Sequence, residues 1–189
     1  MIRAAALASV LAIAAQAAHA EPVFDAFTSI CVKNAADGAA SLAAADAAGW
    51  MPIPAPMMQN FSKLGFDNPD GRIKTDAAGL YIVLVGSSSR PIEGLSVSMR
   101  VCAVATTAAA AGAALNDEMA AWAAVPSEPR LSHGSQVAYA FTEEGGVHRV
   151  LQDPTGAEAK ALLASGRANF AFVRSDPKMA MVAFAVPKM

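Results

Sequence analysis

The chain contains two cysteines, Cys31 and Cys102, whose chemistry depends on their surroundings. Lipidation of Cys31 would need a small residue just before it, and Ile30 is bulky. The two cysteines are far apart in the sequence and form no C-x-x-C motif, so we expect no zinc site from them. An even number of cysteines in an exported chain favours one disulfide, with two separate buried thiols as the alternative.

A carboxylate and an imidazole meet in the stretch "EEGGVHR" at 143–149. A two-residue Gly-Gly turn would place Glu143 opposite His148 in a hairpin. Such a pair could act as a general base in a small hydrolase, with Glu144 as a second carboxylate. The alternative is a solvated hairpin tip. His133, in the polar loop "RLSHGSQ", is a second candidate base.

Arg100 is a charged residue in the middle of an apolar stretch, between Met99 and Val101. A partly buried guanidinium needs a carboxylate or carbonyl partner. We interpret Arg100 either as an anion-recognising residue or as half of a structural ion pair.

The segment "WMPIPAPMMQNF" at 50–61 combines three prolines with large, soft side chains. The prolines predict an extended path without helix. Methionine and tryptophan are common at adaptable binding surfaces, so this is the preferred binding surface. The alternative is a loop that closes the core. The candidate binding residues here are Trp50, Met51, Ile53, Met57 and Met58.

Other chemistry is not supported by the sequence. The stretch "DNPDG" at 67–71 predicts a turn, because a calcium loop needs alternating oxygen ligands and a distant Glu. The chain has no Gly-rich nucleotide motif and no G-x-S-x-G nucleophile motif. We therefore expect no metal site and no cofactor.

Residues 1–20 have the build of a cleaved signal peptide. Arg3 supplies the positive start, an apolar run follows, and Ala18 and Ala20 are the small residues of the cleavage site. Losing Arg3 changes the formal net charge from −2 to −3, and no basic patch is present. We expect a periplasmic or secreted protein without a membrane span, and nucleic acid is a poor candidate partner.

Residues 21–189 predict a single α+β domain. Helical spacing at 23–31 turns Cys31 inward with the phenylalanines. Asp37 or Ser41 can cap a second helix that ends at Gly49. We expect an antiparallel sheet of about six strands, with the N-terminal helices and two inter-hairpin helices packed on it. The expected hairpins are 80–105, 136–152 and 168–186, and the expected helices between them are 106–125 and 155–165.

The strand at 95–105 has two unlike faces. Val97, Met99 and Ala103 lie on an apolar face, which we expect to face the core. Cys102 lies on the more polar face with Arg100. A disulfide to Cys31 therefore requires the first helix to cover this second face.

The pattern Phe27-x-x-x-Cys31, an alanine-rich helix and then Gly49-Trp50 resembles small uncharacterised secreted proteins of the bacterial envelope. The resemblance covers residues 24–50. It implies export to a bacterial periplasm and adds no site residue.

These observations lead to three hypotheses. The first is a non-enzymatic binding or accessory module of the bacterial envelope, whose partner is an envelope protein or a small apolar or anionic ligand. The second is a small hydrolase that uses His148 and Glu143. The third is an inhibitor or immunity-type protein of an envelope enzyme.

Overall fold

The computed structural model describes residues 21–61, 66–77, 79–92, 95–108, 111–151 and 157–188, so the predicted signal peptide lies outside it. The described strands form one antiparallel sheet in the order β1-β2-β3-β4-β8-β7-β5-β6. The strands are β1 (Met51–Pro52), β2 (Asp67–Thr75), β3 (Leu80–Ile92), β4 (Leu95–Thr106), β5 (Gln136–Glu144), β6 (Val147–Val150), β7 (Asn169–Asp176) and β8 (Met179–Pro187).

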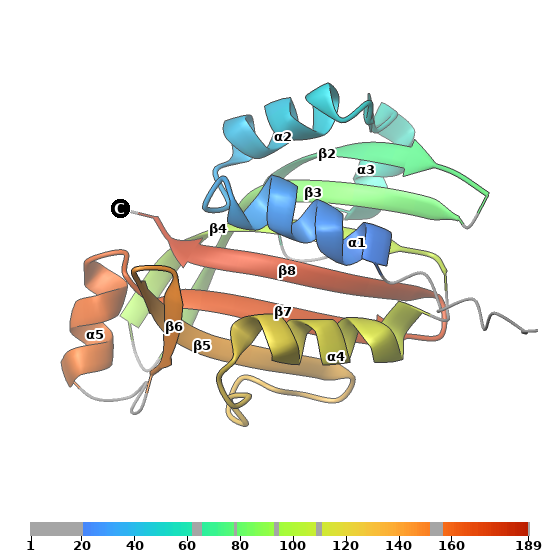
Figure 1. Ribbon diagram of the computed structural model, residues 1–189. Coiled ribbons are helices and arrows are strands. Elements are labelled where there is room, and N and C mark those ends of the chain that lie inside the picture. The colour runs from blue at the N-terminus through green and yellow to red at the C-terminus, as the bar shows by residue number, and fades with distance from the viewer. Residues whose placement is uncertain are drawn as a thin grey trace, which may run out of the picture.

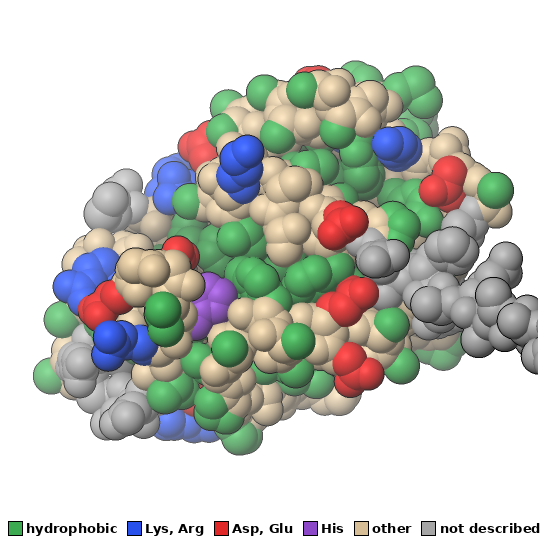
Figure 2. Space-filling view, in the orientation of Figure 1, with side chains coloured by type: hydrophobic (Ala, Val, Ile, Leu, Met, Phe, Trp, Pro, Cys, Tyr) green, Lys and Arg blue, Asp and Glu red, His purple; other side chains and the backbone are tan. Residues whose placement is uncertain are grey.

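Helices cover both faces of this sheet. The helices are α1 (Glu21–Ala26), the π-helix η1 (Phe27–Val32), α2 (Gly38–Ala47), α3 (Ala55–Phe61), α4 (Ala111–Ala123) and α5 (Ala157–Ala164). Figure 1 shows α1, α2 and α4 on one face of the sheet. Apolar side chains gather between α1 and α4 (Figure 2). No helix in the described ranges has the length and apolar character needed to cross a bilayer.

The predicted α+β class and antiparallel sheet are confirmed, but the predicted strand number is wrong, since the described residues form eight strands and not about six. The additional strands β1 and β2 fall in 50–75, where proline and turn residues predicted irregular structure. In β2 the turn residues form a bulge between Asp67 and Asp70, with Asn68 at φ 50°. A bulge absorbs such residues without ending the strand.

The helix α3 also contradicts the prediction of a wholly extended segment. The Pro54 carbonyl accepts the backbone N–H groups of Met57 and Met58 at 2.9 and 3.2 Å. Pro56 lies in the first turn of α3, where a helix needs no N–H donor. Proline at this position therefore begins the helix.

The largest core cluster lies on the face of β4 that carries Cys102. The expected core face is buried as well, but in two smaller clusters. Val97 and Met99 pack with Leu163 of α5, and Ile82 and Leu84 pack beneath α3. The sequence pattern thus assigned the main core to the wrong face, because strands with helices on both sides do not show a single apolar face.

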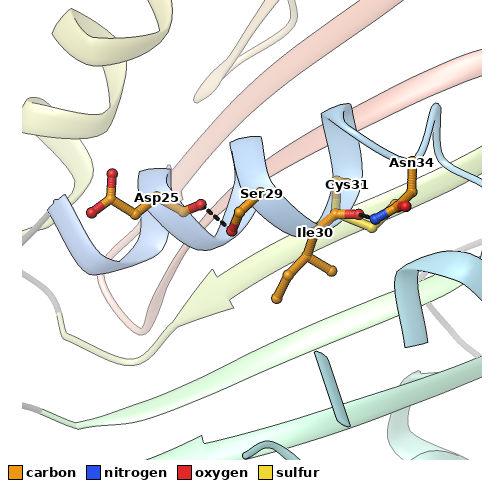
Figure 3. Close-up of a disulfide and its surroundings, with 6 residues drawn as sticks. Asp25, Ser29, Ile30, Cys31 and Asn34 are labelled. Carbon is orange, nitrogen blue, oxygen red and sulfur yellow. Dashed lines mark hydrogen bonds between the residues drawn. A yellow bond between two sulfur atoms is a disulfide. The ribbon is translucent and has the colours of Figure 1, made fainter. Parts of the chain in front are cut away.

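The predicted disulfide joins Cys31 of η1 to Cys102 of β4, with Cα atoms 5.3 Å apart and both residues fully buried. The helix around Cys31 is a π-helix, which the helical spacing did not predict. Side-chain donors bind one carbonyl of α1 and one of η1: Ser29 Oγ donates to Asp25 O at 2.6 Å, and Asn34 Nδ2 to Ile30 O at 2.8 Å (Figure 3). The disulfide therefore fastens the first helical segment to a central strand.

Gly112 permits α4 to lie close to β7. A Cβ at this position would lie 2.8 Å from Ser175 Cβ and still nearer its Oγ. Alanine normally favours a helix interior over glycine by about 1 kcal/mol, whereas overpacking costs about 1–3 kcal/mol. The overpacking cost exceeds the helix gain over most of this range, so we expect Gly112→Ala to lower the free energy of unfolding by about 1 kcal/mol, measured by urea denaturation.

Gly38→Ala is the matched control, because the added Cβ would make only an ordinary 3.6 Å contact with Val85. We expect this variant to be neutral or slightly more stable. Adding Ser175→Gly to Gly112→Ala should recover part of the loss. A Gly112→Ala protein at least as stable as wild type would contradict the close approach.

An ion pair joins α2 to β2. Arg72 Nε and Nη2 donate to the two carboxylate oxygens of Asp46 at 2.6 and 3.2 Å. This hydrogen bonding lowers the pKa of Asp46 below its ordinary 3.8. The pair therefore stabilises the fold above the ordinary pKa, and that contribution disappears as the pH falls through the lowered pKa.

We expect Asp46→Asn to lower the melting temperature at neutral pH and to have little effect at about pH 2 to 3. Thermal unfolding of both proteins across this range measures the difference. An equal difference in melting temperature at neutral pH and at about pH 2 to 3 would show that packing, and not the ion pair, is responsible.

Candidate functional site

Five of the nine methionines gather around one small core cluster on the sheet face opposite the disulfide. Four of them pack on one small core cluster, and Met51 pairs with Ile73, which packs on that same cluster. We call this set the methionine surface. Its members are Met51, Met57, Met58, Met179 and Met181.

The register of the strands explains how distant methionines reach this face. Met181 of β8 lies opposite Ala105 of β4, which lies opposite Ile82 of β3. Ile82 lies opposite Ile73 of β2, and Ile73 lies opposite Met51 of β1. Directly paired residues share a face. The row therefore crosses five strands, or about 19 Å at the usual strand spacing.

The helix α3 adds its methionines to the same place. Met57 and Met58 pack on the buried residues Ile53, Ile82, Leu84 and Ala105, and so do Met179 and Met181. Thioethers from segments more than 100 residues apart thus share one apolar platform. Ala105 has a short side chain, so the centre of this apolar platform rises little above the sheet.

These methionines differ in exposure from the others that the structure describes. Met51 is 59% exposed, and the other four of the surface are half-buried. Met99 and Met119 are 6% and 0% exposed and belong to the other core clusters. The thioethers of the methionine surface can therefore meet a ligand from solvent, and those of Met99 and Met119 cannot.

The candidate binding segment is only partly at the surface. Trp50 and Ile53 are 8% and 7% exposed, so both are core residues. Met51, Met57 and Met58 remain accessible. Sequence reasoning missed Met179 and Met181, although the alternation in "MAM" at 179–181 places both on one strand face. Their meeting with α3 depends on the pairing of β8 with β4.

Arg100 lies on the opposite face from the methionine surface. Its Nη1 is 3.8 Å from an Asp37 carboxylate oxygen, and its Nε is buried without a hydrogen-bond partner. Asp37 also caps α2 by accepting from Ala40 N at 2.9 Å. The structure thus gives Arg100 a loose ion pair and does not bring it near the methionines.

The predicted pairing of Glu143 with His148 is confirmed, and the turn glycines have φ of 60° and 79°. The imidazole is half-buried, and its Nδ1 lies 3.1 Å from the Ala123 carbonyl at the end of α4. A carbonyl only accepts, so Nδ1 carries a proton. The ring also packs on Trp122 and Phe141, with centroids 4.7 and 4.2 Å apart.

Glu143 is exposed, and no ion pair joins it to His148, both of which the structure describes. His133 is exposed too, with its backbone paired to Gln136. Glu143 and His148 are therefore cross-strand neighbours without an ion pair, and His148 helps to hold α4 on the β5–β6 hairpin.

Among the residues that the structure describes, no group of three or more His, Cys, Asp or Glu residues could hold a metal ion. Both cysteines of the chain are in the disulfide. The side chains that gather at one place are the methionines of the methionine surface.

Comparison with protein-family models, with curated proteins and with solved structures finds no match to this chain.

Proposed function

We propose that the protein is an exported, non-enzymatic binding module of the bacterial envelope, periplasmic or secreted, and that the methionine surface is its binding site. The observation that carries the proposal is the convergence of half-buried methionines from α3 and β8 on one platform. Methionine is flexible and polarisable, which suits a surface that adapts to a ligand.

Export is supported by two observations. Residues 1–20 have the build of a signal peptide, and the cysteines form a disulfide. The binding hypothesis has more support than the hydrolase hypothesis, because the imidazole of His148 bonds a backbone carbonyl and packs on two aromatic rings.

Capture from envelope extract tests the binding site. The bait is the mature chain in three forms: wild type, Met57→Asp/Met58→Asp, and the control Ala113→Asp/Ala121→Asp. The control alanines are exposed on α4, on the other face of the sheet. We expect a component that binds wild type and the control but not the methionine variant. Identical captures by all three folded proteins would refute the binding site.

A further inference from the structure

We propose that the ligand of the methionine surface is a soft monovalent metal ion, Cu(I), held by thioethers of α3 and β8. The donors are Met57 or Met58 from the helix, with Met179 and Met181 from the strand. This inference rests on the proposed function and names its ligand class.

The donor set points to this ion. Thioether sulfur is neutral, polarisable and a poor ligand for hard cations such as Mg²⁺ and Ca²⁺, whereas soft sulfur ligands select Cu(I). Carboxylate and imidazole donors do not cluster in the described ranges. The chain also has no free thiol, because its two cysteines are bonded to each other. A soft cation would therefore meet methionine sulfur first.

The fold brings the four methionines to one buried cluster. Met179 and Met181 alternate on one face of β8, so their Cα atoms are about 7 Å apart. Met57 and Met58 of α3 pack against the same cluster of four buried residues as they do. Ala105, opposite Met181 in the register, is a small member of that cluster.

Met51 lies at the other end of the row, about 19 Å from Met181. That distance exceeds the combined reach of two methionine side chains toward one ion. Met51 therefore lies outside the proposed coordination sphere, although it belongs to the same face.

The charges beside the site nearly cancel. Arg174 lies opposite Met181 on β7 and is exposed. Asp176 Oδ1 accepts from Met179 N at 3.1 Å, so a carboxylate lies at the other β8 methionine. Neutral ligands and balanced surroundings suit a monovalent ion better than a divalent one.

The test is titration of the mature chain with silver nitrate in chloride-free buffer, followed by calorimetry. Ag(I) has the same charge and soft character as Cu(I) and is stable in air. We expect one equivalent to bind to wild type. Replacing Met57, Met58, Met179 and Met181 together by leucine should weaken binding at least about tenfold. Leucine conserves volume, so the platform should remain packed.

The control is Met99→Leu/Met119→Leu, two buried positions in the other core clusters, and it should bind Ag(I) as wild type does. Binding should also be constant between about pH 5.5 and 7.5, because thioethers do not take up protons there, whereas imidazole does. Cu(I) under anaerobic conditions, in competition with a chromophoric chelator, should give the same order of variants.

The proposal is overturned if wild type binds no Ag(I) or Cu(I), or if the quadruple leucine variant binds as tightly as wild type. It is also overturned if binding weakens as the pH falls from about 7.5 to 5.5. The proposed function survives these failures if Met57→Asp/Met58→Asp still loses an envelope partner that the leucine variant keeps. If wild type captures no such envelope partner either, both proposals are refuted.

Discussion

Replacing both Cys31 and Cys102 by alanine is expected to lower the free energy of unfolding by about 4 kcal/mol. The disulfide closes a loop of 71 residues, and its loss frees the unfolded chain to occupy more conformations. Both residues are fully buried, so alanine avoids leaving an unpaired polar group in the core. Urea denaturation of wild type and the double variant measures the difference.

This loss is large for one domain, since total stability is commonly about 5–15 kcal/mol. Wild type reduced under denaturing conditions and then refolded is the control, and it should match the double variant. The oxidised chain should also be two protons lighter than the reduced one. A difference in stability below about 1 kcal/mol would contradict a disulfide that constrains the fold.

Trp122→Ala is expected to lower the free energy of unfolding by about 3 kcal/mol. The indole lies edge-on to Phe27, Phe141 and His148, with ring centroids 5.4, 5.7 and 4.7 Å away. It joins α4 to η1 and to the β5–β6 hairpin. Its removal therefore leaves a cavity shared by three elements, and thermal or urea unfolding measures the cost.

Trp122→Phe is the matched control and should cost less, because a ring still fills part of the space. His148→Phe should keep the ring packing and lose only the bond to Ala123, a cost of about 1 kcal/mol. Equal stability of Trp122→Ala and Trp122→Phe would show that the aromatic cluster contributes little.

Local patterns predicted the features that depend on near neighbours in the chain. The Gly-Gly turn predicted the pairing of Glu143 with His148, because such a turn sets the register of both strands. Helical spacing predicted that Cys31 points inward, and the even number of cysteines in an exported chain predicted the disulfide to Cys102. Such a bond requires the first helix to cover the face of β4 that carries Cys102, and it does.

Features that depend on distant segments could not be predicted in the same way. The adjacency of β4 and β8 brings residues about 76 positions apart together, as with Met181 and Ala105. No local pattern specifies that pairing. For this reason Met57 and Met58 were recognised as candidates and Met179 and Met181 were not. The partner of the His148 ring, the Ala123 carbonyl, depends on how α4 crosses the sheet.

The segment 50–75 was misassigned because its prolines and turn residues act at element ends and bulges. Pro56 stands in the first turn of α3, and Asn68 stands in the bulge of β2. By residue type alone, prolines and turn residues predict irregular structure. In this fold Pro56 begins a helix, and Asn68 lies where the strand bends. The burial of Trp50 and Ile53 then anchors the segment to the core.

NMR of the mature chain labelled with ¹³C at the methionine methyl groups tests the central claim most directly. On addition of silver nitrate, the account predicts that the methyl signals of Met57 or Met58 and of Met179 and Met181 shift together. The signals of the distant Met51 and of the buried Met99 and Met119 should stay in place. Unchanged signals throughout, or equal shifts of the buried methionines, would contradict a soft-ligand site at the methionine surface.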